Sequence, residues 1–147
     1  MVKPAMRAKD VVDQLTKQHG EILQLVQELD SILDGAGNID KAVRIKGLLD
    51  KLIEILDTHL KIEDKLLYPI LIKSTNHKVK TTAAVFSEEM GSIAKELGLY
   101  LGKWTTSISI ANGSEGFMKE TKELISVLLK RIEREDNELF PLLLSPH

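Results

Sequence analysis

Five side chains that can bind metals or pair as ions stand where apolar side chains are expected. They lie within stripes of apolar residues that recur every three or four positions, and they are His19, His59, Glu63, Arg131 and Glu135. Such a stripe is the buried face of an amphipathic helix. An ionised group on that face is costly unless it is paired or bound to a cation. The pattern therefore indicates a polar site inside the protein.

The spacing of these residues narrows the chemistry. His59 and Glu63 are four residues apart, and so are Arg131 and Glu135, so each pair projects from adjacent turns of one helix face. Imidazole nitrogens and carboxylate oxygens that converge between helices suit borderline divalent metals such as iron, zinc or manganese. Taken alone, His59 and Glu63 are better explained as a hydrogen-bonded pair in the core than as metal ligands, because isolated matches of this kind are common.

A segment of the chain occurs twice, and this repeat favours a metal site over a simple hydrogen-bonded pair. Residues 59–71 read HLKIEDKLLYPIL, and residues 131–143 read RIEREDNELFPLL, 72 positions later. An internal repeat reveals architecture more directly than other sequence signals. We therefore expect two copies of one helix pair, with halves at about residues 10–73 and 81–144, in a single domain of residues 1–147.

Only the first copy keeps its histidines. The main repeat sets His59 against Arg131, and a second echo sets Gln18-His19 against Glu89-Met90. We interpret Met90 as core filler, because methionine adapts to irregular gaps. A haem held by His19 and Met90 is conceivable in a helical bundle, but no other residue supports it.

Arg131 has two interpretations. It can extend to the end of the bundle, near Glu133 or Asp136. It can also point inward and bridge Glu63 and Glu135 as a permanent cation in place of one metal. Arginine suits the second arrangement, because it stays charged when buried and pairs bidentately with carboxylates. We favour the inward interpretation.

The hydrophobic period predicts an all-α protein. Long helices are expected over residues 9–33, 39–72, 82–104 and 117–140. Their apolar stripes and short connections predict an up-down-up-down four-helix bundle. The second stripe, counted in steps of three and four, ends with Leu66 and Ile70, and Pro69 is expected to kink or end that helix.

The connections carry their own expectations. The glycines of residues 34–38 are expected to close the first helix in a left-handed cap. Residues 74–78 form the central connection between the two halves. Residues 105–116, rich in Ser, Thr, Asn and Gly, are expected to form a loop.

Composition excludes several classes of protein. The 20 basic and 22 acidic residues give a net charge of -2 with no basic stripe, which argues against nucleic acid as a partner. The absence of cysteine excludes disulfides and thiolate metal sites. No apolar run approaches the roughly 20 residues needed to span a bilayer. The first ten residues have charges and no apolar segment, so we expect no secretory signal and a cytoplasmic location.

Taken together, these segments resemble the hemerythrin family, in particular bacterial hemerythrin-like proteins with the His-His-Glu (HHE) cation-binding domain. The resemblance covers roughly residues 10–144 and includes the aromatic-Pro steps Tyr68-Pro69 and Phe140-Pro141. In that family the bundle holds an oxo- or hydroxo-bridged di-iron centre. The centre serves reversible dioxygen binding, or the sensing of oxygen, nitric oxide or iron.

The resemblance implies a ligand set in this chain. The residues that match the family's ligands are His19, His59, Glu63 and Glu135. Met90 and Arg131 stand where the second half would supply histidines, and neither His77 nor His147 can replace them. Two histidines and two glutamates can hold one metal, with water or another small ligand completing the shell. The set is too poor in nitrogen for the usual pair of irons.

Two functional hypotheses follow. The first is a hemerythrin-like protein that binds at most one transition metal, iron before zinc or manganese, and acts as a sensor or carrier of a small diatomic ligand. The alternative is a metal-free descendant that serves as an interaction or structural module with an unknown protein partner. An enzyme ranks third, because no nucleophile-base pair is evident, although a single open iron site could activate oxygen.

Overall fold

The structure, a computed structural model, describes residues 8–144 of the chain, and every regular element in that range is helical. The predicted all-α class is confirmed. Residues 1–7, on which most of the secretory-signal expectation rests, and His147 lie outside the described range. No helix between residues 8 and 144 is both long enough and apolar enough to cross a bilayer.

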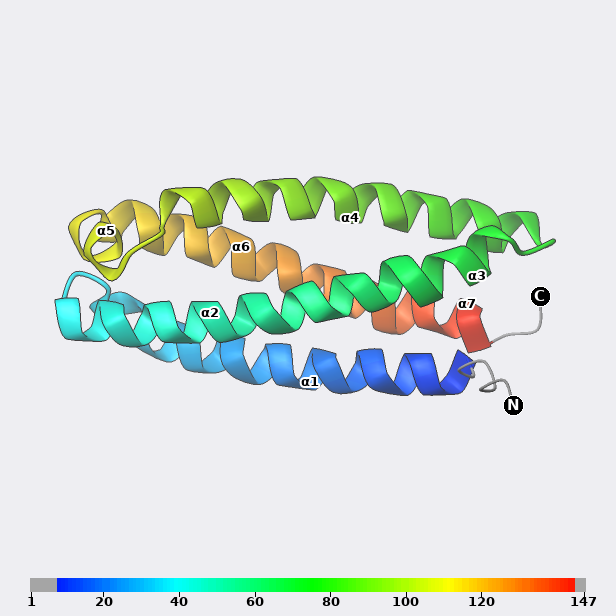
Figure 1. The fold of residues 1–147 in the computed structure, drawn as a ribbon, viewed down its shortest axis with the longest axis horizontal. Coiled ribbons are helices and arrows are strands. Elements are labelled where there is room, and N and C mark those ends of the chain that lie inside the picture. Colours follow the sequence, from blue (N-terminus) through cyan, green and yellow to red (C-terminus); the bar gives the residue numbers. More distant parts are fainter. Residues whose placement is uncertain (1–7, 145–147) are drawn as a thin grey trace, which may run out of the picture.

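Four long helices run lengthwise through the molecule (Figure 1). They are α1 (Ala8–Ile32), α2 (Ile39–Ile62), α4 (His77–Lys103) and α6 (Ser114–Arg134). α1 packs against α2, and α6 contacts both α1 and α4. Each carries an apolar stripe toward its neighbours and charged residues outward, as the helical period predicted.

A widened turn of π-helix interrupts each of the two repeated segments. The turns are η2 (Glu63–Leu67) and η3 (Glu135–Leu139), and each is followed by one further turn of α-helix, α3 (Tyr68–Ile72) or α7 (Phe140–Leu144). The Tyr68 N–H donates to the carbonyl of Glu63, and the Phe140 N–H donates to that of Glu135, five residues back in both cases. The prolines that follow have no N–H and would crowd an ordinary turn, so the wider turn accommodates them.

The π turn η2 corrects the predicted core. Leu67 and Leu71 are fully buried, whereas Ile70, a predicted core residue, is 42% exposed. Leu66 is only partly buried. The inserted residue shifts the buried stripe by one position, so steps of three and four along the sequence select the wrong side chains beyond Glu63.

The third long helix begins five residues earlier than predicted. The Asn76 side chain caps α4 by accepting hydrogen bonds from the N–H groups of Lys78 and Val79. This satisfies donors that a helix start otherwise leaves unpaired. The central connection is correspondingly shorter than residues 74–78.

The predicted loop of residues 105–116 is wrong for most of its length. It contains a short helix, α5 (Ser107–Asn112), and α6 begins at Ser114. The Thr106 hydroxyl accepts from the Ser109 N–H, and the Ser109 hydroxyl accepts from the Thr106 N–H, which is a capping box. Ile110 fixes this helix to the rest of the molecule, because its side chain is fully buried.

The left-handed cap expected after α1 is also wrong. No glycine among the described residues has a positive φ angle. A 3₁₀ turn, η1 (Leu33–Gly35), ends the first helix, with the Ala36 N–H donating to the Leu33 carbonyl. Asn38 then caps α2 through its side-chain oxygen.

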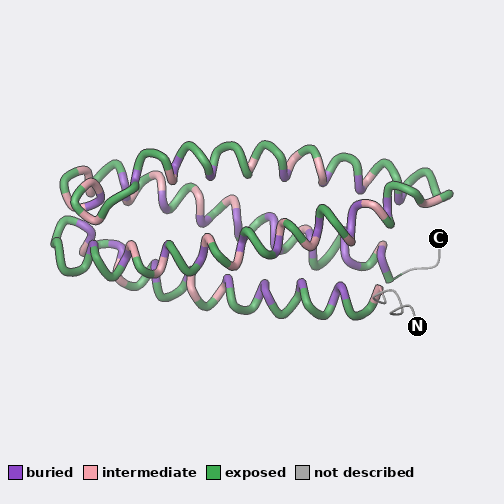
Figure 2. Tube along the Cα trace, viewed as in Figure 1, coloured by how far each residue is buried: buried purple, intermediate pink, exposed green. Residues whose placement is uncertain are grey.

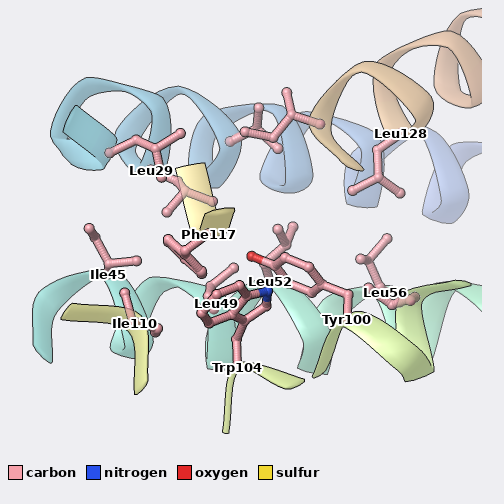
Figure 3. Close-up of a cluster of buried hydrophobic side chains, with 14 of the residues drawn as sticks. Leu29, Ile45, Leu49, Leu52, Leu56, Tyr100, Trp104, Ile110, Phe117 and Leu128 are labelled. Atoms are coloured by element: carbon pink, nitrogen blue, oxygen red, sulfur yellow. The ribbon is translucent and has the colours of Figure 1, made fainter. Parts of the chain in front are cut away.

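The buried apolar side chains form two separate clusters. The larger lies toward α5 and includes Leu49, Leu52, Trp104 and Phe117 (Figure 3). The smaller gathers Leu15, Leu67, Phe86, Leu139 and other residues near α3 and α7. Figure 2 shows that buried positions recur along the inner side of each long helix. The five polar residues singled out in the sequence lie between the two clusters.

Candidate metal centre

The polar layer draws one or two residues from each of several helices. α1 supplies His19, α2 supplies His59, and α6 supplies Arg131. Glu63 and Glu135 are the first residues of the two π turns. All five are at most 5% exposed, so the sequence correctly placed them inside the protein.

Three potential ligand atoms converge at the middle of this layer. The Nε2 atoms of His19 and His59 are 3.2 Å apart. Oε1 of Glu135 lies 2.8 Å from the first and 3.1 Å from the second. Ligand atoms of these three residues all lie within 4.8 Å of one another, which is compact enough to surround one metal ion.

The opposite edge of each imidazole is held by an acceptor. Nδ1 of His19 lies 2.8 Å from Oδ1 of Asp136, and Nδ1 of His59 lies 2.9 Å from Oε1 of Gln18. A carboxylate or amide oxygen only accepts, so each Nδ1 carries a hydrogen. In the neutral rings both Nε2 lone pairs then face the centre, where only a proton or a cation can satisfy them.

Glu63 adds a second reason to expect a cation. It is fully buried, and neither carboxyl oxygen has a hydrogen-bond partner among the described residues. Its Oε1 lies 3.6 Å from Nε2 of His59. Burial, and then the negative charge of Glu135, raise the pKa of Glu63 well above its usual value. Glu63, which has no hydrogen-bond partner, lies beside two imidazole nitrogens and a second carboxylate. Together these groups form a donor set that fits one metal ion.

Glu135 has the opposite electrostatic character. Burial alone would raise the pKa of Glu135, but hydrogen bonds from His19 and His59 outweigh burial and hold it far below its usual value. Burial alone would lower the pKa of His19, yet its contacts with Glu135 and Asp136 raise it. Protonation of His19 and ionisation of Glu135 therefore favour each other.

Arg131 points inward, as we expected. Its Nε donates to Oε2 of Glu135 at 3.1 Å. One Nη donates to the Tyr68 hydroxyl at 2.7 Å and to the Phe86 carbonyl at 2.9 Å, and the guanidinium lies 4.6 Å from the centre of the Phe86 ring. The predicted bridge to Glu63 is wrong, because Arg131 engages only Glu135 of the two acids.

Met90 lies beside the centre without joining the group of ligand atoms. It lines a small cavity of about 20 Å³ together with His59, Arg131 and Glu135. The remaining wall is apolar and comes from Ile22, Leu56, Leu60, Leu128 and Ile132. A larger groove of about 390 Å³ between α4 and α6 shares none of these residues. The small cavity is therefore adjacent to the polar layer, whereas this groove is not.

Sequence reasoning missed four residues that complete the site. They are Gln18, Tyr68, Glu89 and Asp136. All four belong to the repeated segments or stand beside a site residue in the chain. Their partners, however, are 40 or more positions away, so periodicity alone could not identify the contacts.

Comparison with known families assigns the chain. A model of the family described as "Hemerythrin HHE cation binding domain" matches residues 10–143. Because this match covers nearly the whole sequence, the protein belongs to that family. Comparisons with curated proteins and with solved structures gave no significant match.

Proposed function

We propose that this protein binds a single transition-metal ion between His19, His59, Glu63 and Glu135. Iron is the first choice, with zinc or manganese as alternatives. The observation that carries the proposal is the convergence of two imidazole Nε2 atoms and Oε1 of Glu135 within 4.8 Å. Membership of a cation-binding family supports it. Two imidazoles and one or two carboxylates leave part of the coordination shell open, as in sites that bind a further small ligand.

The role proposed for this site is that of a sensor or carrier. A bound metal would supply a positively charged centre with affinity for a small diatomic molecule such as dioxygen or nitric oxide. The cavity of about 20 Å³ beside His59 exceeds the roughly 10–15 Å³ that one water molecule requires. Its apolar lining from Ile22, Leu56 and Leu128 favours an uncharged occupant. The proposal includes a cytoplasmic location and an up-down-up-down bundle whose halves are related by a pseudo-two-fold axis.

Arg131 accounts for the limit of one metal. Its guanidinium donates to Oε2 of Glu135, on the side where a second ion would need a ligand. Met90 and Arg131 replace the two nitrogens that the second half would supply. A fixed cation and a metal ion at the same carboxyl edge would repel each other.

Metal analysis tests this proposal. Protein purified without chelators is expected to contain up to one metal ion per chain and to take up one Fe(II), Zn(II) or Mn(II) ion on titration. His59→Ala should abolish that uptake, whereas His77→Ala, at an exposed position, should leave it unchanged. Two tightly bound irons per chain, with the charge-transfer bands of an oxo-bridged pair, would contradict the proposal.

The alternative is a metal-free interaction or structural module. The observation that favours it is the set of contacts around Glu135, which already receives hydrogen bonds from Arg131, His19 and His59. A protein that purifies without metal and takes up none of the three ions would establish this alternative.

A further inference from the structure

Two polar side chains outside the ligand set contact the Nδ1 atoms of the imidazoles, on the side of each ring away from the centre. Oδ1 of Asp136 lies 2.8 Å from Nδ1 of His19, and Oε1 of Gln18 lies 2.9 Å from Nδ1 of His59. Asp136 directly follows Glu135 in the π turn η3, and its side chain is 42% exposed. Gln18 directly precedes His19 in α1 and is buried. Each imidazole therefore has an acceptor on the face away from the centre.

The Asp136 contact determines what His19 presents to the centre. Carboxylates face both ring nitrogens, Asp136 at Nδ1 and Glu135 at Nε2, and each can accept a hydrogen from the ring. The Asp136 contact stabilises the neutral tautomer that carries its hydrogen on Nδ1, which is the tautomer whose Nε2 can bind a metal. Nε2 then turns its lone pair toward Glu135 and His59. The Phe140 ring, stacked on His19 at 5.2 Å between centroids, limits rotation of the imidazole. Position, tautomer and orientation of the ring are thus all set by neighbouring groups.

We propose that Asp136 and Gln18 are positioning residues that raise the metal affinity of the centre by fixing the Nδ1–H tautomers of His19 and His59. This inference rests on the proposed metal binding. The Asp136 carboxylate also makes the ring a stronger electron donor, because a negative charge at Nδ1–H increases the basicity of Nε2. Asp136 therefore has the larger effect of the two.

The repeat provides a matched control. Asp64 stands 72 positions before Asp136, follows Glu63 in the π turn η2, and is likewise exposed. The His19–Asp136 contact joins the two halves, and its equivalent would join Asp64 to Met90, which has no N–H to donate. The Asp64 side chain accordingly makes no hydrogen bond within residues 8–144. The same residue type thus occurs in the same local structure without an imidazole to orient.

The first measurement is the Zn(II) dissociation constant, obtained by competition with a chromogenic chelator. Asp136→Ala should weaken binding by about 10–100-fold, the usual effect of losing such a partner. Asp136→Asn should lose less, because its amide oxygen still accepts from Nδ1 without the charge. Gln18→Leu should weaken binding in the same direction. Asp64→Ala should bind Zn(II) as the unchanged protein does.

The second measurement reads the tautomer directly in the metal-free protein. Long-range ¹H–¹⁵N spectra at high pH should show the His19 hydrogen on Nδ1 in the unchanged protein and in Asp64→Ala. In Asp136→Ala it should move to Nε2, because Glu135 becomes the remaining acceptor. A purely structural role for Asp136 would not move this hydrogen.

The outcomes separate the two levels of the proposal. If the unchanged protein takes up no Zn(II), the proposed function is wrong and the positioning role falls with it. If the unchanged protein binds Zn(II) and Asp136→Ala binds it equally well, only the positioning role is overturned. An unmoved His19 hydrogen in Asp136→Ala would overturn it as well.

Discussion

The two halves of the repeat place different polar residues at equivalent buried positions, and each residue has a different partner. In the first half, Gln18 accepts a hydrogen bond from His59 at 2.9 Å. In the second half the equivalent residues are Glu89 and Arg131, whose Oε2 and Nη1 atoms are 3.6 Å apart. A neutral amide faces the imidazole, and a carboxylate faces the guanidinium. The change at the ligand position is thus accompanied by a matching change at its neighbour.

The aromatic residue before each proline also differs between the halves, and it too matches the polar residue that it contacts. Phe140 stacks on His19, whereas its equivalent Tyr68 accepts a hydrogen bond from Arg131. The tyrosine hydroxyl provides an additional acceptor, which a guanidinium needs because it has more N–H groups than an imidazole. Arg131 therefore has partners of its own, drawn from both halves of the repeat, and its surroundings differ from those of a histidine site that has merely lost its ligands.

The equivalent acids complete the contrast. The pKa of Glu63 is raised well above its usual value, chiefly by burial, while imidazole hydrogen bonds lower the pKa of Glu135 despite burial. The pKa values of two carboxyl groups in equivalent π turns are therefore shifted in opposite directions. Such divergence is typical of sites where one acid holds a proton and its neighbour holds a charge.

The largest expected effect comes from restoring the histidines of the second half. Met90→His combined with Arg131→His should raise iron uptake from one toward two ions per chain, because both nitrogen ligands return. Elemental analysis after reconstitution with Fe(II) measures this, and circular dichroism checks folding. A folded double variant that takes up no additional iron would show that the halves are no longer equivalent in shape.

Truncation of the arginine alone should be strongly destabilising. Arg131→Ala removes the buried partner of Glu135 and should lower the free energy of unfolding of the metal-free protein by about 3–5 kcal/mol. Arg134→Ala is the matched control on the same helix, since its pairs with Glu89 and Glu138 are largely exposed and should contribute about 0–1 kcal/mol. Denaturant titration at neutral pH compares them. Equal losses would contradict the buried role of Arg131.

Replacing each acid by its amide should change stability in opposite directions. Folded Glu63 keeps a proton that the unfolded chain releases above a pKa of about 4.3, so it lowers stability progressively as pH rises toward its folded value. Glu63→Gln should therefore stabilise the metal-free protein, by about 1–3 kcal/mol at pH 8 and less at pH 5. Urea titrations at the two pH values measure this gain.

Glu135→Gln is the second of the two acid-to-amide replacements, and it is expected to lower stability. The lowered pKa of Glu135 contributes stability above the unfolded pKa, and that contribution is lost only in strong acid. Its amide variant should therefore be less stable than the unchanged protein at both pH values. Glu133→Gln, at an exposed position, should show neither effect. Stabilisation by both buried replacements would contradict the opposite pKa shifts of Glu63 and Glu135.

The smallest effect is expected at Tyr68. Tyr68→Phe gives the first half the aromatic residue that the second half has and removes one hydrogen bond to Arg131. The cost should be about 0.5–1.5 kcal/mol in denaturant titration, because the same Nη still donates to the Phe86 carbonyl. No loss would mean that the hydroxyl is incidental to the arginine site.

Much of this arrangement could be predicted from sequence, and the errors have local causes. The repeat and the apolar stripes correctly placed His19, His59, Glu63, Arg131 and Glu135 inside the protein. The stripe failed at Leu66 and Ile70, because periodicity counting assumes ordinary α-helix through Glu63. The Asn76 and Thr106 caps were visible in the sequence but were outweighed by the expectation of loops.

The orientation of the imidazoles could not be predicted in the same way. Asp136 and His19 are 117 residues apart, and either could have met other partners across the bundle. Only the packing of α1 against α7, the helical turn that follows η3, brings them together. Periodicity assigns a residue to a helix face, whereas the hydrogen-bond partner depends on how the helices pack.

The π turns decide which changes this repeat tolerates. Deleting one residue from η2 would return it to ordinary α-helix and rotate everything beyond by about 100°. That rotation would carry Leu67 and Leu71 out of the smaller cluster and bring Ile70 toward it. Substitution at a ligand position leaves the turn intact, because the backbone bond from Tyr68 to Glu63 does not depend on the side chain at position 63. Each half can therefore accept single substitutions at its ligand positions, whereas a one-residue deletion in the π turn would disrupt the packing beyond it.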